Sequence, residues 1–220
     1  MRFIAAFLIL SWTTALWATP PGNVVFSELM WMGSPVSNAD EWIELCNRSQ
    51  DPVDLSGWTI TRQLEDHEAI MLRIEQGKLA PGAAFLIANY PPEDGRSALA
   101  VQPQLVSSAL SLANTKLQLR LYDGDPEAGA HLVDIADDGS GAPLAGDAQL
   151  KKAMVRVLLD TDGTLPISWA TAEEASGWDD GVEASGTPGQ VFVPDADAAA
   201  DSSLSTEISP VTWASLKPYR

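Results

Sequence analysis

The sequence predicts an all-β protein, and three observations near its start carry that prediction. Residues 24–30, 41–47 and 53–63 are rich in β-branched and aromatic residues, as strands are. A polar cluster at residues 47–52, Asn-Arg-Ser-Gln-Asp-Pro, separates the second stretch from the third in the manner of a turn. Hydrophobic residues make up 45% and charged residues 20% of the 220 residues, so one domain of sandwich size can bury a core.

Further strands are expected in the middle of the chain. Residues 69–74 form an apolar run between acidic loops, and Pro81-Gly82 suits the central positions of a type II turn. Residues 84–88 are apolar on both alternating sides, which predicts a central strand buried on two faces. The polar, proline-rich stretch 89–106 is expected to be a long loop.

The second half of the chain predicts a hairpin and two last strands. Leucines alternate with polar residues over 117–122, which indicates a half-exposed strand, and residues 132–135 are its expected hairpin partner. Residues 154–159 predict the last well-marked strand. Residues 167–171 predict a short edge strand after it.

Short motifs within these segments follow one another in order: residues 25–30, 41–45 with Asn47, 54–58, 79–82, 85–87, 117–124, 133–134, Trp169 and 186–189 (Gly-Thr-Pro-Gly). Together they resemble the lamin-tail domain as it occurs in exported bacterial proteins, over residues 22–190. The resemblance implies an immunoglobulin-like β-sandwich. It implies a binding or scaffolding role, since domains of this family look like such modules, and a shared sandwich by itself specifies no chemistry.

The first 18 residues predict a signal peptide. Arg2 precedes the apolar run 3–10, and residues 20–22 (Pro-Pro-Gly) would break any helix. The run is shorter than the roughly 20 residues that span a bilayer. We expect cleavage after Ala18, with Ala15 as the alternative, and a secreted or periplasmic mature chain without a transmembrane segment.

Net charge limits the classes of binding partner, and the cysteine content limits the disulfides that the chain can form. The formal net charge of −17 disfavours binding to nucleic acid, since an acidic surface repels phosphates. Cys46 is the only cysteine, so no intrachain disulfide can form. In strand alternation Cys46 lies on the face of Trp42 and Glu44, which predicts a half-buried, inert thiol; intermolecular pairing is the alternative.

Acidic residues raise the possibility of catalysis. Glu28, Glu41 and Glu44 lie on or beside the first two strands, and simple alternation places Glu28 on the face of Phe26. Structural hydrogen bonding, or pairing with arginines, is the favoured interpretation. The alternative is a small extracellular hydrolase, or its accessory domain, that uses clustered carboxylates and a divalent cation.

Asp160 and Asp162 are the candidate residues for binding calcium. Residues 160–163 (Asp-Thr-Asp-Gly) begin like an oxygen-rich cation loop, but the twelfth residue is Thr171 rather than glutamate. An Asp-Gly turn explains the same residues without metal. The favoured prediction is therefore a protein without a cofactor.

Exposed aromatic residues are the candidate binding groups. Trp31 at a strand end and Trp178 in a loop could stack on a sugar or anchor a peptide, although packing over the ends of the sandwich is the commoner outcome. Residues 194–206 predict a flexible linker. Residues 207–220 form a short aromatic and basic tail whose candidate binding residues are Trp213, Tyr219 and Arg220, with a frayed tail as the alternative. The sequence thus predicts a non-catalytic binding module for a protein or cell-surface ligand.

Overall fold

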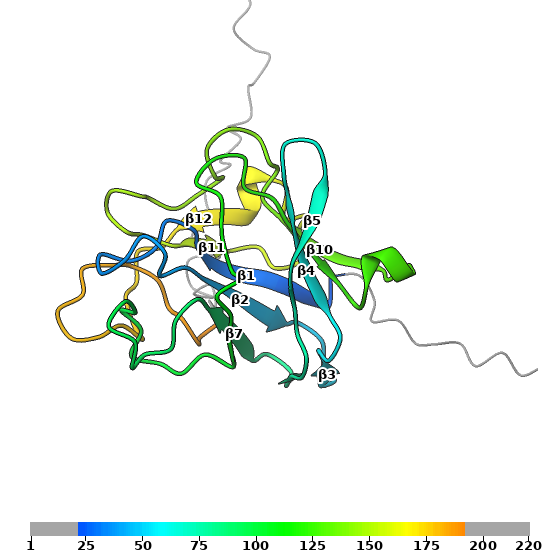
Figure 1. Ribbon diagram of the computed structural model, residues 1–220, viewed down its shortest axis with the longest axis horizontal. Helices are drawn as coiled ribbons and strands as arrows, with labels where there is room; N and C mark the ends of the chain where they lie inside the picture. Colours follow the sequence, from blue (N-terminus) through cyan, green and yellow to red (C-terminus); the bar gives the residue numbers. More distant parts are fainter. Residues whose placement is uncertain (1–21, 192–220) are drawn as a thin grey trace, which may run out of the picture.

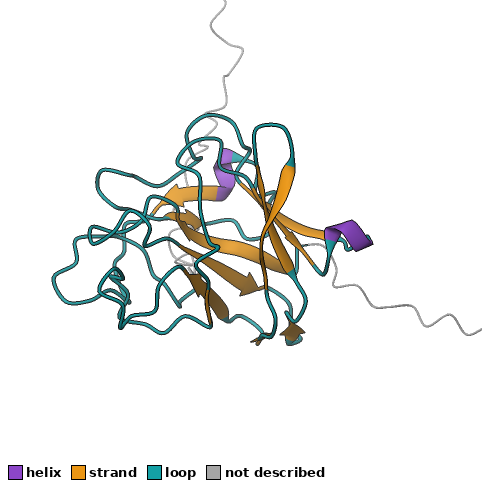
Figure 2. Cartoon of the chain, viewed as in Figure 1, coloured by secondary structure: helices purple, strands orange, loops and turns teal. Residues whose placement is uncertain are grey.

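The computed structural model describes residues 22–191. The expected signal peptide, the linker 194–206 and the tail 207–220, with Trp213, Tyr219 and Arg220, lie outside the described residues. Within residues 22–191 the chain is built almost wholly of β-strands and loops, with two single-turn 3-10 helices, η1 at Pro126–Ala128 and η2 at Pro166–Ser168 (Figures 1 and 2). None of the helices in this part of the chain has the length and apolar character needed to cross a bilayer.

The larger layer is a six-stranded sheet in the order β12-β11-β1-β2-β7-β8. All neighbours are antiparallel except β7 and β8, which are parallel. Every residue of the central strands β1 and β2 is buried. The strands are β1 (Val24–Met30), β2 (Trp42–Asn47), β7 (Ala84–Ala88), β8 (Leu105–Val106), β11 (Met154–Arg156) and β12 (Trp169–Thr171).

The smaller layer is a four-stranded antiparallel sheet in the order β10-β9-β4-β5, and the predicted hairpin of β9 with β10 is confirmed. Its strands are β4 (Thr59–Gln63), β5 (Glu68–Arg73), β9 (Leu119–Tyr122) and β10 (Leu132–Ala136), beside the small pair β3 (Val53–Asp54) and β6 (Lys78–Leu79). The prediction of one strand over 53–63 is wrong. A turn at Gly57, whose φ is +84°, separates β3 from β4, because this left-handed conformation favours glycine.

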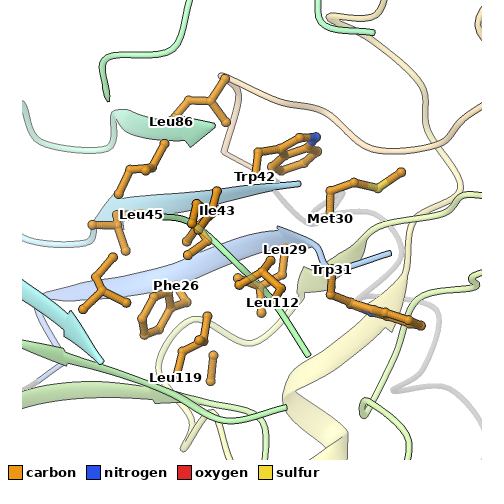
Figure 3. Close-up of a cluster of buried hydrophobic side chains, with 14 of the residues drawn as sticks. Phe26, Leu29, Met30, Trp31, Trp42, Ile43, Leu45, Leu86, Leu112 and Leu119 are labelled. Atoms are coloured by element: carbon orange, nitrogen blue, oxygen red, sulfur yellow. The ribbon is translucent and has the colours of Figure 1, made fainter. Parts of the chain in front are cut away.

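Apolar side chains fill the space between the sheets and also cover the outer face of the larger sheet. Phe26 and Leu119 lie between the layers, whereas Trp42 and Leu86 lie on the opposite side of β1 and β2 (Figure 3). Loops cover this second face. The predicted burial of β7 on both faces is therefore confirmed, although β1 and β2 hold the centre of the sheet.

A β-bulge in β1 decides which side chains face outward. Phe26 pairs with Leu45 and Glu28 pairs with Glu44, so Ser27 is the extra residue of the bulge. The bulge shifts the alternation, and Phe26 faces the core while Glu28 faces outward with Glu44. The prediction that Phe26 and Glu28 share a face is wrong for this reason.

Candidate functional site

Two buried carboxyl groups face each other on the outer side of the six-stranded sheet. Glu28 and Glu44 are register partners on β1 and β2, with exposed fractions of 1% and 0%. The bulge residue Ser27 donates a hydrogen bond of 2.8 Å from its hydroxyl to Glu44 Oε1. In a strand without the bulge, alternation would place the two carboxyl groups on opposite faces of the sheet. The bulge at Ser27 brings them together on the outer face.

The segment 186–190 closes over this pair. Thr187 donates to Glu28 from its amide (3.0 Å) and from its hydroxyl (2.9 Å), and the Gly189 amide donates to Glu44 Oε2 (2.8 Å). Gly186 permits the close approach, because a Cβ there would lie 2.8 Å from Glu28 Oε1. The Gly-Thr-Pro-Gly motif is therefore a cap on the acids.

Burial makes both carboxyl groups weak acids. The pKa of Glu28 is raised to about 7, mainly by desolvation and further by the charge of Glu174, against the hydrogen bonds from Thr187. The pKa of Glu44 is raised to about 8, first by burial and then by the charge of Glu28. Such a pair titrates as a unit and tends to retain one proton near neutral pH.

Glu41 lies apart from this pair. Its carboxylate accepts a hydrogen bond of 2.9 Å from the Leu112 amide, and burial raises its pKa to about 7 while the charge of Arg62 opposes that rise. The three acids do not converge in an open pocket. Acid–base hydrolysis needs two carboxyls that reach a substrate, so this arrangement favours the structural role predicted for them over the hydrolase alternative.

The predicted aromatic binding residues have internal partners. Trp31 is only 6% exposed and its indole N–H donates to the Ala145 carbonyl (3.0 Å), so it packs internally, as the commoner of the two outcomes has it, and is not the exposed aromatic that the candidate binding role needs. Trp178 is half-buried, with its ring centre 6.1 Å from that of Trp42. Its indole N–H donates to the Gly186 carbonyl (2.9 Å), which helps to hold the closing segment. Both packing sites depend on segments distant in sequence.

The candidate calcium residues lie on the loop between β11 and β12. Asp160 is exposed, and Asp162 Oδ1 accepts hydrogen bonds of 2.9 Å from both the amide and the hydroxyl of Thr164, which lower the pKa of Asp162. Across residues 22–191, no three or more His, Cys, Asp or Glu side chains are grouped so that they could hold a metal ion. Asp162 thus acts as a local cap within its loop.

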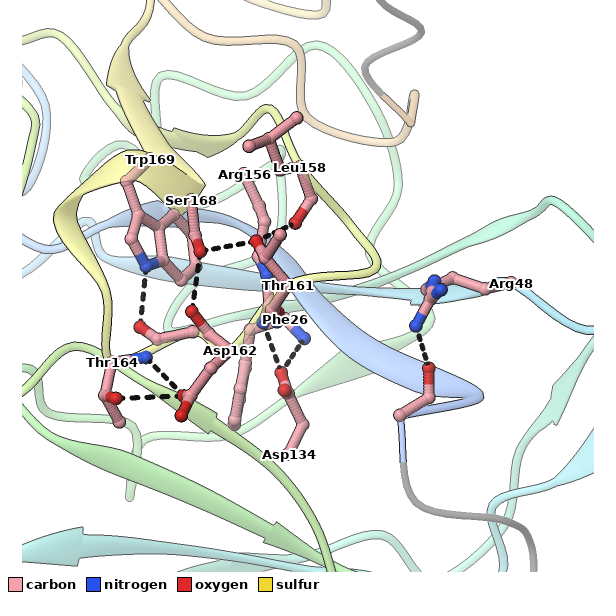
Figure 4. A network of polar contacts seen from close by, with 12 residues as sticks. Phe26, Arg48, Asp134, Arg156, Leu158, Thr161, Asp162, Thr164, Ser168 and Trp169 are labelled. Carbon is pink, nitrogen blue, oxygen red and sulfur yellow. Dashed lines mark hydrogen bonds and ion pairs between the residues drawn. The ribbon is translucent and has the colours of Figure 1, made fainter.

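The same loop, residues 157–168, is braced from within (Figure 4). The indole N–H of Trp169 donates to the Gly163 carbonyl (2.7 Å), and the Ser168 hydroxyl donates to the Asp162 carbonyl (2.6 Å). Arg156, itself buried, donates to the Thr161 carbonyl and to Asp134 Oδ2. These bonds fix the loop to β11 and β12, and Arg156 links it further to Asp134 on β10.

The braced loop carries three exposed aliphatic side chains. The exposed fractions are 37% for Leu158, 46% for Leu165 and 68% for Ile167. The sequence analysis does not predict this exposure, because it places Leu158 in a strand and Ile167 in an edge strand. The signal for exposure is the pair of large aliphatic residues that flank Pro166, Leu165 and Ile167. Binding residues are frequently found on loops that a rigid scaffold positions.

The two packed sheets, with a closed acid pair and a braced loop at one edge, define an immunoglobulin-like β-sandwich module. The sequence model of the Lamin Tail Domain matches residues 18–173, and the chain belongs to the lamin tail domain family. A search of the curated proteins found no match to this chain. The segment 186–190 that caps Glu28 and Glu44 lies beyond the matched residues.

Proposed function

We propose that this chain is a non-catalytic binding or scaffolding module that works outside the cytoplasm and contacts a protein or cell-surface ligand through the loop 157–168. The observation that carries the proposal is the exposure of Leu158, Leu165 and Ile167 on a loop held by internal hydrogen bonds. A rigid apolar loop loses little conformational entropy on binding, so it favours association.

The remaining features support the same role. The acids that could have served catalysis are buried under backbone and hydroxyl donors. The net charge of −17 disfavours nucleic acid as the partner. The amino-terminal apolar run supports export, and sequencing the amino terminus of exported material would test it; a first residue other than Thr19 or Leu16 would contradict the expected processing.

The loop proposal is tested by comparing capture from the extracytoplasmic fraction by immobilised mature protein and by the double variant Leu165→Ser, Ile167→Ser. We expect the variant to lose at least tenfold of the specifically captured ligand, because hot-spot residues commonly cost 2 kcal/mol or more when truncated. The matched control is Val36→Ser, Val106→Ser, which removes two aliphatics of similar exposure elsewhere. Equal capture by both variants and the unmodified protein would refute the loop as the binding surface.

A further inference from the structure

A small apolar pocket of about 260 Å³ lies on the outer face of β11 and β12, next to the acid pair. Val155 is the register partner of Glu28 and Ala170 is the partner of Val155, so these side chains face outward together. Val157 and Ala172 extend the same floor by strand alternation. Thr187, which donates to Glu28, also lines the pocket.

The size of the pocket indicates its kind of occupant. Sites for drug-sized ligands usually enclose about 300–1,000 Å³. At about 260 Å³ this pocket is smaller, and it suits one large side chain that anchors a peptide. Its floor is aliphatic, so an aromatic or aliphatic anchor fits better than a polar one.

The rim of the pocket is acidic. Glu173 and Glu174 line it, and their side chains lie at the exposed end of β12. Lys152 pairs with Glu173 at 2.9 Å. Glu174 is close enough to Glu28 to raise its pKa. An occupant with a cation beside its apolar anchor would therefore be complementary.

The chain itself leaves the sandwich beside this pocket. The Gln190 amide donates to the Thr187 carbonyl (2.9 Å), so Val191 follows one residue after a contact with the pocket wall. Residues 192–220 continue from that point, and their only basic residues are Lys217 and Arg220. Trp213 precedes Lys217 by four residues.

We propose that the segment 207–220 binds in cis to this pocket, with the Trp213 ring on the floor of Val155, Val157 and Ala170 and with Lys217 beside Glu174. Twenty-one residues, 192–212, lie between Val191 and Trp213. A flexible chain of that length has a root-mean-square span of about 25 Å. Tethering of this kind gives an effective concentration in the millimolar range, so even a weak contact is populated.

The first experiment titrates a synthetic peptide of residues 207–220 into the chain 19–206 by calorimetry. We expect saturable binding, at least tenfold weaker for the Trp213→Ala peptide and for the domain variant Ala170→Leu, whose larger side chain fills the pocket. Lys217→Glu in the peptide should also weaken binding, and more so at low salt. The control variant Val106→Ser lies on the opposite edge strand and should bind as the unmodified domain does.

The second experiment keeps the chain whole. In the 5-fluorotryptophan-labelled chain 19–220, the ¹⁹F resonance of Trp213, assigned with Trp213→Phe, should be shifted from its position in the free peptide. Ala170→Leu should return it to that position, and dilution should leave it unchanged. A resonance at the free-peptide position, or a shift that disappears on dilution because a second copy supplies the tail, would overturn the proposal.

The pocket shares Val157 with the loop 157–168, but this inference does not rest on Leu158, Leu165 and Ile167 as a binding surface. Loss of ligand capture by Leu165→Ser, Ile167→Ser with an unchanged Trp213 resonance would leave the tail proposal standing. A Trp213 resonance at the free-peptide position, together with loss of ligand capture by Leu165→Ser, Ile167→Ser, would overturn the tail proposal and leave the loop proposal standing.

Discussion

Asp134 on β10 and Arg156 on β11 form a buried ion pair of 2.7 Å that ties the four-stranded sheet to the six-stranded sheet. The side chains are 7% and 1% exposed. Asp134 Oδ2 also accepts a hydrogen bond of 2.9 Å from the Phe26 amide on β1. Burial raises the pKa of Asp134 to about 6, against the charge of Arg156 and these hydrogen bonds. The pair therefore links the two layers inside the core.

Removing one partner of this pair should be costly. Arg156→Met leaves a buried carboxyl group without its cation, for which a loss of about 3–5 kcal/mol in the free energy of unfolding is expected. The loss should shrink at acidic pH, where Asp134 is neutral. Denaturant unfolding measures it, with Arg73→Met as the control, since the side chains of the Arg73–Asp125 pair are 41% and 33% exposed and the loss there should be much smaller. Equal effects of the two substitutions would contradict the structural role of the buried pair.

The acid pair predicts that stability falls as pH rises. Both carboxyls have folded pKa values, about 7 for Glu28 and about 8 for Glu44, above their ordinary values near 4.5, so the folded state binds protons more tightly than the unfolded state. The contribution of the two protonated carboxyls to the free energy of unfolding is complete below pH 4.5. It is lost as the pH rises from 4.5 to 8. Thermal unfolding across that range should show a decreasing melting temperature.

Glu44→Gln tests this assignment. The amide can donate to the Ser27 hydroxyl and accept from the Gly189 amide, so both contacts survive without a charge. We expect a flatter pH profile and a gain on the order of a few kcal/mol at pH 8. Glu75→Gln, at an exposed site, is the control. A Glu44→Gln profile parallel to that of the unmodified protein would show that the pair does not titrate in this range.

Gly163 should tolerate no side chain. A Cβ at this position would lie 1.9 Å from the Ile135 carbonyl oxygen and 2.7 Å from Arg156 Nη1. Gly163→Ala should therefore destabilise the protein by about 1–3 kcal/mol or more, the range for overpacking. Gly95→Ala is the matched control, because no atom lies within 4 Å of its added Cβ. Chemical denaturation of both variants distinguishes close packing from a general effect of replacing glycine.

Cys46 should be unreactive in the folded protein. It is buried, and burial followed by the charge of Glu44 raises the pKa of its thiol to about 11, so little thiolate forms at neutral pH. A thiol reagent such as DTNB should modify it only after denaturation. Fast labelling of the native protein, or a reducible dimer on a non-reducing gel, would instead favour the intermolecular pairing considered from the sequence.

Calcium should not stabilise the protein. Asp162 already accepts two hydrogen bonds from Thr164, which compete with a cation for its oxygen. Calorimetric titration should show no binding heat and thermal unfolding no change in melting temperature. A rise in melting temperature that Asp162→Asn abolishes would establish a calcium site in the loop 157–168.

The all-β class and the positions of most of the longer strands follow from the sequence by itself. Alternation and turn residues are local properties, so they are visible within a few neighbouring residues, as in the hairpin of β9 and β10. The same local signals indicated a tight turn at Pro81-Gly82, where Gly82 has a φ of +68°.

The tertiary structure alone decided which side chains meet. One extra residue at Ser27 turned Glu28 toward Glu44, and no alternating pattern contains that shift, because a bulge depends on the partner strand. The donors on Glu28 come from Thr187, 159 residues away, and the partner of Asp134 is 22 residues away on the other sheet. Contacts of this kind depend on packing between distant segments, whose free energy a local sequence pattern does not encode.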